Sequence, residues 1–447
     1  MIPDQIASSA ICYAYHPDIG AACQNEYPVT DDPEMVWANR GNFEGLYPGL
    51  FYGVTGLMAS SAIEFSAIAM RIFSAVLCVG ITTALFLLLP VRRRATLTWS
   101  WLISIIPLGI FTIASNNPSS WAIISGGALW IALVGFFETT GKQRVGLAIV
   151  AVLATLIGAG ARADSAVYAG LAAGVALVLT FERSRRWLLS ALLPVGVIVI
   201  AVVFYFSSFQ GAVAASGSSM ASGGPQKNPL ILLASNILNL PLLWAGVFGH
   251  EGLGDWGLGW LDTLMPGVMT VGALVCFGAV VFAGFTFTSW RKNLALAGVA
   301  LALLVFPLYV LYQAHAIVGA EVQPRYILPL IVMLAGIALF AVDGRGLMLS
   351  RLQKYFVATV LTVAHGVALH YNLRRYITGM DLGNWNLDVG IEWWWGGLSP
   401  MFVWTLGTVT FGVVAFVIAR SLSEGIPSGD EVTSEWSLAK DVTTQHS

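Results

Sequence analysis

The polar side chains that could take part in chemistry occur in four short stretches, each beside a long apolar run. An amide can bind hydroxyl or phosphate oxygens, a carboxylate can act as a general base, and a guanidinium group forms a fixed fork for phosphate. The stretches are SNNPSSW (115–121) with Asn117, ARADS (161–165) with Arg162 and Asp164, FGHEGLGDWGLGWLDTLMP (248–266) with His250 and Asp262, and AEVQPRYILPLI (320–331) with Arg325.

Each of these residues also has a simpler structural explanation. Asn117 could turn the chain and cap the next helix, and Arg162 with Asp164 could neutralise each other beside the membrane rather than line a polar cavity. Asp262 precedes an apolar run and is expected to cap it. Arg325 either anchors to lipid headgroups or binds the phosphate of a lipid-linked molecule. The pair His250 and Glu251 is not by itself a metal-binding motif.

The composition places these stretches in an integral membrane protein. The chain has 447 residues, of which 57% are hydrophobic and only 10% are charged, whereas soluble domains have about 25% charged residues. Its apolar runs are far too long for strands, so the fold class is an all-α, polytopic bundle of transmembrane helices. Eleven spans are predicted, at 65–90, 97–114, 121–137, 145–160, 164–181, 187–206, 265–289, 294–313, 326–342, 355–372 and 399–419.

Basic residues in the short loops predict the orientation of these spans, because such loops remain in the cytoplasm. The segment 230–248 is apolar, but as a further span it would move Arg291 and Lys292 outside, so we expect it to lie in the outer interface or to re-enter from there. The predicted organisation is then an external N-terminal loop (1–64), a helical domain (65–419) with an external loop at 207–264, and a disordered cytoplasmic tail (420–447). Arg374 and Arg375 fall outside by this count, so either they bind phosphate or the topology is wrong there.

The N-terminal loop contains two of the four cysteines, Cys12 and Cys23, which could form a disulfide on the oxidising side of the membrane. Cys78 and Cys276 lie within apolar runs and are expected to pack there. An external loop of this length without a leading apolar segment also leads us to expect a missing helix before Met1.

Four landmarks together resemble a bacterial family of multipass membrane proteins of unknown function (DUF2142-like). They are YPGLFYGVTGL (47–57), SNNPSSWAI (115–123), GWLDTLMP (259–266) and QPRYILPL (323–330), the last containing Arg325 and Tyr326. That family is similar in layout to the GT-C glycosyltransferases, which take a sugar from a polyprenyl phosphate on the external face. The resemblance implies a GT-C-like bundle with external loops.

The resemblance does not identify a catalytic base in this chain. Family members typically open with a helix followed by an acidic motif resembling Pro-Asp-Glu, and this sequence begins after that point. Asp262 and Glu44 are therefore only weak candidates for the catalytic carboxylate. The expected substrate-binding residues are Arg325, Tyr326, His250, Asn117, Arg162 and Asp164.

The function predicted from the sequence is a glycosyltransferase-like role in assembling cell-envelope glycans, at the plasma membrane. The alternatives are a transporter or flippase of lipid-linked glycans, and a truncated, inactive paralogue. The expected partners are membrane lipid and a polyprenyl-phosphate-linked sugar, and no nucleic acid. No cofactor is indicated, although a divalent metal stays open.

Overall fold

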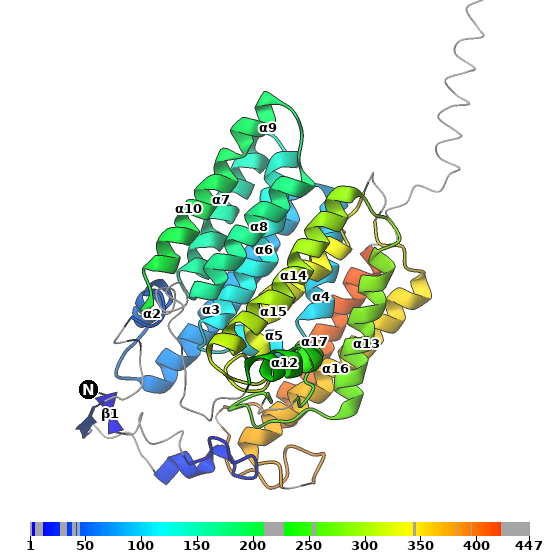
Figure 1. Ribbon diagram of the computed structural model, residues 1–447. Helices are drawn as coiled ribbons and strands as arrows, with labels where there is room; N and C mark the ends of the chain where they lie inside the picture. Colours follow the sequence, from blue (N-terminus) through cyan, green and yellow to red (C-terminus); the bar gives the residue numbers. More distant parts are fainter. Residues whose placement is uncertain are drawn as a thin grey trace, which may run out of the picture.

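The computed structural model describes residues 2–4, 12–26, 34–37, 42, 45–209, 228–252, 256–342, 346–381, 383–394 and 396–421. In this part of the chain each of the eleven predicted spans corresponds to one helix or to two short helices in succession (Figure 1). The prediction of an all-α polytopic bundle is confirmed. The spans are α3 (Ile63–Leu88), α4 with α5 (Val91–Ser104, Leu108–Ile113), α6 (Ser119–Glu138), α7 (Gly141–Ala159), α8 (Ala163–Leu179), α9 with α10 (Arg185–Ser190, Leu192–Phe206), α13 (Gly267–Gly284), α14 (Trp290–Gln313), α15 (Pro324–Ala338), α16 (Arg351–Ile377) and α17 (Pro400–Ser421).

The predicted span 97–114 is interrupted, which the apolar pattern did not reveal. Pro107 lies between α4 and α5 and has no backbone N–H to continue the helical ladder. The short helix α5 is therefore followed directly by the Asn117 turn, which brings both to the same end of the bundle.

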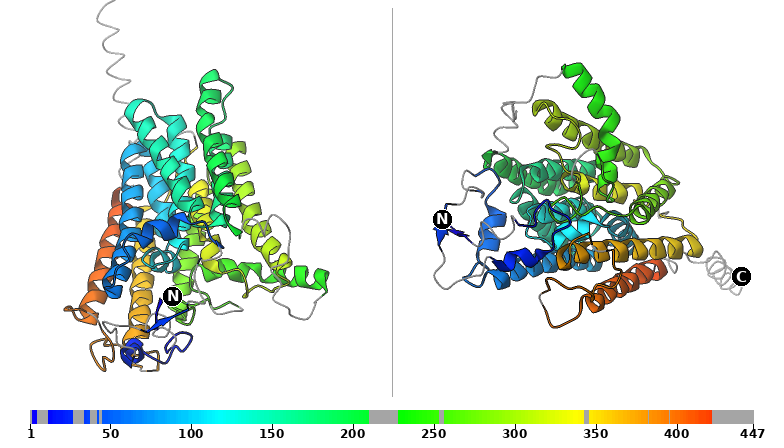
Figure 2. Two further views of the ribbon diagram at one scale, coloured as in Figure 1. Left: turned by 90° about the vertical axis from the view of Figure 1, so that its left-hand side faces the viewer. Right: turned by 90° about the horizontal axis from the view of Figure 1, so that it is seen from below.

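Helix α12 (Pro229–Gly246) is long and apolar enough to span a membrane but does not run with the spans. Figure 1 shows it along its own axis, and the left view of Figure 2 shows it lengthwise across one end of the bundle. The buried side chain of Asn236 fixes it there, donating to the carbonyl of Ala316 at 2.9 Å and accepting from the amide of Val318 at 2.9 Å. This arrangement agrees with the charge pattern, which required that 230–248 should not cross.

Helices α6 and α15 form the centre of the bundle. A helix that is apolar on all sides is suited to complete burial, and small residues allow its neighbours to approach closely. A Cβ added to Gly126 of α6 would lie 2.9 Å from Cα of Pro329 in α15, and one added to Gly336 of α15 would clash with the ring of Trp130 in α6. These contacts fix the position of α15 within the bundle.

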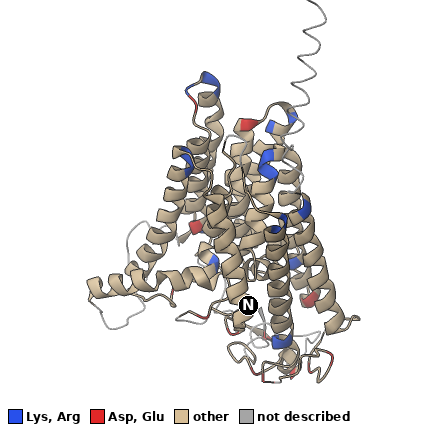
Figure 3. Cartoon of the chain, turned by 90° about the vertical axis from the view of Figure 1, so that its right-hand side faces the viewer, with Lys and Arg blue, Asp and Glu red and all other residues tan. Residues whose placement is uncertain are grey.

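The bundle has two chemically different ends (Figure 3). We call the end that carries Arg92, Lys142, Arg185, Arg291 and Arg351 the basic end, because the helices α4, α7, α9, α14 and α16 begin there. We call the opposite end, where α12 and the N-terminal segment lie, the loop end.

The C-terminus of α15 is anchored at the basic end by three side chains from other helices. Thr96 donates to the carbonyl of Leu339, Lys292 to that of Phe340 and Arg93 to that of Ala341, at 3.3, 3.2 and 2.8 Å. These carbonyls follow the last turn of the helix, where hydrogen-bond donors and cations are favourable. Because α15 is anchored at this end, its opposite end has a fixed position at the loop end.

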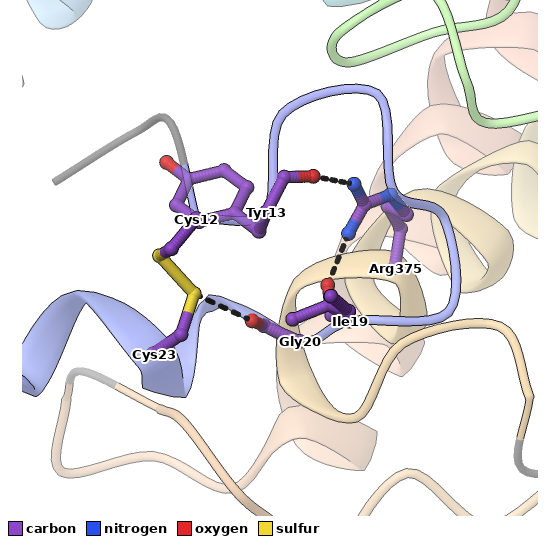
Figure 4. The surroundings of a disulfide bond; sticks show 6 residues. All are labelled: Cys12, Tyr13, Ile19, Gly20, Cys23 and Arg375. Atoms are coloured by element: carbon purple, nitrogen blue, oxygen red, sulfur yellow. Dashed lines mark hydrogen bonds between the residues drawn. A yellow bond between two sulfur atoms is a disulfide. The ribbon is translucent and has the colours of Figure 1, made fainter. Parts of the chain in front are cut away.

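The N-terminal segment contains little regular structure in its described residues. Strands β1 (Ile2–Pro3) and β2 (Met35–Val36) form an antiparallel pair. The short helix η1 (Ala21–Glu26) lies between the two strands in the sequence, and the short helix α2 (Leu50–Gly56) comes after β2. The structure joins Cys12 to Cys23 by a disulfide (Figure 4). Cys276 is buried in α13, and Cys78 is partly buried in α3. The predicted disordered tail lies outside the described residues from 422 onward.

Candidate functional site

Three connections at the loop end enclose a cavity of about 370 Å³, counting the part that opens to solvent. They are the α5–α6 turn, the segment between α12 and α13, and the start of α15. The lining residues are Leu108, Phe111, Thr112, Ser115, Asn117, Trp256, Gly257, Gly259, Leu261, Gln323, Pro324 and Arg325.

Arg325 lies in the first turn of α15, directly after Pro324. Its guanidinium has no carboxylate within 4 Å among the described residues, and its buried Nε has no hydrogen-bond partner there. The ring of Tyr326 lies 5.4 Å from the guanidinium carbon. Arg325 therefore presents a charge to the cavity that no acidic residue in the described chain neutralises.

The helix terminus beside Arg325 also favours an anion. Gln323 is the N-cap of α15, but its side chain does not cap the helix, and its buried Oε1 has no partner in the part described. The N-terminus of a helix carries partial positive charge and free N–H groups, which suits phosphate.

Two further donors line the same cavity. Trp256 is 3% exposed, and its Nε1 has no acceptor among the described residues. Its Cε3 and Cζ3 edge faces Gly246 and Gly252, so the opposite edge, with Nε1, points away from them. Asn117 uses its oxygen to accept from the amide of Ser119 at 2.9 Å, which leaves its NH₂ group available. The turn expected for Asn117 is therefore present, and the residue lines the cavity as well.

Arg162 and Asp164 form a buried ion pair with an N–O distance of 2.7 Å, and neither of them lines the cavity. Burial alone disfavours the charged guanidinium, but attraction and hydrogen bonding to Asp164 outweigh it and raise the pKa of Arg162. The guanidinium carbon lies 4.1 Å from the ring centre of Tyr326. The pair thus neutralises itself and holds the aromatic ring that adjoins Arg325.

Asp262 does not cap the following span, so that prediction is wrong. Helix α13 begins at Gly267, its N-cap is Pro266, and no side chain caps it. Asp262 instead binds Arg375 of α16 through both carboxylate oxygens, at 3.2 Å from Nε and 2.6 Å from Nη2. The partner lies 113 residues away in sequence, so adjacency to the span gave a misleading signal.

This ion pair also accounts for Arg375, which is 0% exposed and whose predicted external position was anomalous for a basic residue. Arg374, its neighbour, lines a separate small cavity with Thr378 and Asn386.

The other expected site residues do not meet in the cavity. His250 accepts a hydrogen bond from the amide of Gly252 at 3.0 Å, which turns the loop before Trp256, and it is not part of the lining. Glu44 and Asp255 lie outside the described residues. In the part of the chain that the structure describes, no three His, Cys, Asp or Glu side chains come together in a way that could hold a metal.

Sequence reasoning missed Trp256 and Gln323, and it singled out Arg375 without finding its partner Asp262. The density of Gly and Trp in 248–260 marked the loop but not which indole lies in the wall. For Arg375 the available signal was its apparent violation of the positive-inside trend.

The fold and the cavity define an integral membrane protein with a polytopic helical bundle and a polar pocket at one end. Residues 3–334 match the model of a family described as predicted membrane protein (DUF2142), and the chain belongs to this family. No curated protein matches the chain. No solved structure matches it either.

Proposed function

We propose that this protein is a glycosyltransferase-like enzyme of cell-envelope glycan assembly, and that the loop-end cavity binds the phosphate of a polyprenyl-phosphate-linked sugar. The observation that carries the proposal is Arg325, a cation without an acidic partner among the described residues, at the N-terminus of the central helix. Guanidinium groups and helix N-termini are both suited to phosphate oxygens. Trp256 and Asn117 supply neutral donors for the remaining phosphate or sugar oxygens.

The position of the cavity favours a ligand whose lipid part remains in the bilayer. The cavity lies at an end of helices whose outer surfaces are strongly apolar. A headgroup in the cavity with its chain along the bundle satisfies both parts of such a molecule.

Two independent features support an external location for the loop end at the plasma membrane, with the C-terminus in the cytoplasm. Basic residues gather at the opposite end, as in cytoplasmic loops. The Cys12–Cys23 disulfide lies at the loop end, and disulfides persist in oxidising compartments.

In the proposed reaction an acceptor hydroxyl attacks the anomeric carbon of the sugar while the bond from that carbon to the phosphate oxygen breaks. A carboxylate takes the hydroxyl proton, and polyprenyl phosphate leaves with the bonding electrons. Arg325 stabilises the charge that develops on this phosphate. Asn117 contacts the sugar phosphate, and Tyr326, which does not line the cavity, supports the guanidinium of Arg325. His250 shapes the loop, and Arg162 with Asp164 fixes Tyr326.

Asp262 and Glu44 stay the weak candidates for the proton acceptor. Because both oxygens of Asp262 bind Arg375, Asp262 would act as a base only after release from this pair. No metal is part of the proposed step.

The distribution of buried charges favours transfer over transport. Arg93, Lys292 and Lys354 lie at the basic end, and Arg162, Asp164 and Arg375 lie at the loop end. A transport pathway would instead need charged groups along the middle of the helices. The buried imidazole of His365 lies near the middle of α16, but no buried lysine, arginine, aspartate or glutamate does so in the described helices.

The test is transfer of a labelled sugar from polyprenyl phosphate by purified protein in lipid nanodiscs. Arg325→Ala should abolish most of the transfer, whereas Arg185→Ala should retain it, because Arg185 is an exposed arginine at the basic end that does not line the cavity. Equal transfer by the two variants, at equal amounts of folded protein, would remove Arg325 from the site.

A further inference from the structure

The N-terminal loop closed by the disulfide is connected to the cavity wall through one arginine. Arg375 donates from Nη1 to the carbonyl of Ile19 at 2.7 Å and from Nη2 to the carbonyl of Tyr13 at 2.6 Å (Figure 4). The same guanidinium holds both oxygens of Asp262. Arg375 therefore joins two segments that are remote in sequence, residues 12–23 and the cavity loop.

Asp262 belongs to a hairpin, residues 257–263, that forms one wall of the cavity. Backbone bonds close it from Gly257 to Leu261 and in both directions between Leu258 and Thr263, at 3.0 to 3.2 Å. Gly257, Gly259 and Leu261 line the cavity.

The hairpin contains one unfavourable backbone conformation. Leu261 has a φ of +66°, a left-handed conformation that is unfavourable for a residue with a side chain. Such a conformation persists only where the surrounding structure holds it. The three backbone bonds hold the shape of the hairpin, whereas its position against the bundle depends on its neighbours.

The N-terminal loop supplies this support at two points. Tyr15 meets Trp260 edge to face, with ring centres 6.1 Å apart. The second point is Arg375, which needs the carbonyls of Tyr13 and Ile19 as acceptors because it is fully buried. The disulfide closes the chain around these two carbonyls.

The loop fits closely against the end of α16. The amide of Met380 donates to the carbonyl of Pro17 at 2.9 Å, and a Cβ on Gly379 would clash with the backbone of Asp18. Gly379 has a φ of +82°, which glycine adopts without penalty.

We propose that Arg375 is a positioning residue, and that the disulfide-closed loop acts through it to hold the hairpin 257–263 in the geometry that binds ligand. Reducing the disulfide, or replacing the guanidinium with a group that cannot reach all four acceptor atoms, frees the hairpin. The part of this inference that concerns ligand affinity rests on the proposed function, and the part that concerns the hairpin does not.

Two variants and one control separate these parts. Cys12→Ser with Cys23→Ser removes the disulfide, and Arg375→Lys keeps the charge but has a single nitrogen in place of the planar fork. Cys78→Ser is the matched control, since Cys78 is a free thiol of α3. Amide hydrogen exchange is measured without ligand, and binding of farnesyl phosphate is measured by calorimetry.

Both test variants should speed amide exchange about tenfold at Gly257, Leu258 and Thr263. Amide exchange in α7, which begins at the basic end, should stay unchanged. The affinity of both variants for farnesyl phosphate should fall about tenfold, while Cys78→Ser should match the wild type in both measurements. Unchanged hairpin exchange, faster exchange throughout the bundle, or faster hairpin exchange with undiminished affinity would each overturn the inference. If the wild type binds no farnesyl phosphate but the variants still show faster hairpin exchange, the positioning role of Arg375 and the disulfide is supported. The same result would count against the proposed function.

Discussion

Replacing Asp164 with Asn should strongly destabilise the protein, because it leaves a buried arginine without its counter-ion. The amide has nearly the same shape as the carboxylate, so it can still accept from the amide of Ser165, which lies 2.8 Å from Oδ1. The change therefore removes charge while preserving most of the local geometry. The ring of Tyr326 stays beside Arg162, and a cation–π contact contributes only about 0.5–2 kcal/mol.

The free energy of unfolding should fall by about 3–5 kcal/mol, which is the cost of breaking a buried ion pair by removing one partner. This is a large share of a total stability of about 5–15 kcal/mol. The assay is unfolding of the purified protein in one detergent, followed by circular dichroism. Glu64→Gln is the control, since Glu64 is an exposed carboxylate in the first turn of α3.

A double replacement, Arg162→Met with Asp164→Leu, should cost less than Asp164→Asn alone, because it removes both charges together. If Asp164→Asn unfolds at the same temperature as Glu64→Gln, the pair does not stabilise the loop end and the reasoning is refuted.

Three further predictions concern packing, capping and orientation. Gly126→Ala should lower the free energy of unfolding by about 1–3 kcal/mol through overpacking against Pro329, whereas Gly170→Ala, with open space around it, should not; equal melting temperatures would contradict the close contact of α6 and α15. Lys292→Met should lower the free energy of unfolding by about 1–3 kcal/mol, because the buried carbonyls of Gly284 and Phe340 lose their donor. Lys142→Met, at an exposed site, should leave the free energy of unfolding unchanged in the same assay. A fluorescent protein fused after Ser447 should fluoresce and alkaline phosphatase fused there should be inactive, since both report a cytoplasmic C-terminus; the reverse pattern would invert the topology.

The spans could be predicted from the sequence because hydrophobic length is a local property. Twenty apolar residues have few alternatives to a helix in a bilayer, and the basic loops then fixed which apolar segment should not cross. Segment 230–248 was excluded in this way, and α12 indeed lies across the bundle. The interruption at Pro107 was missed because the surrounding residues are uniformly apolar.

The cavity could be predicted only in part, because its geometry depends on contacts between distant segments. Arg325 and Asn117 stood out as polar residues beside spans, and both line the cavity. The partner of Asp262 could not be inferred, because Arg375 is more than a hundred residues away and is brought close only by the fold. Trp256 is one of many tryptophans in the sequence, and only its burial identifies it.

The most direct test of the central claim is to map where a polyprenyl phosphate binds. A derivative with a photoreactive group beside the phosphate is cross-linked to the wild-type protein in nanodiscs, and the modified residues are located by mass spectrometry. The account predicts cross-links in 108–117, 256–261 and 323–325, which Arg325→Ala greatly reduces and Arg185→Ala does not. Cross-links confined to the lipid-facing surfaces of α3 and α17, unchanged by Arg325→Ala, would contradict it.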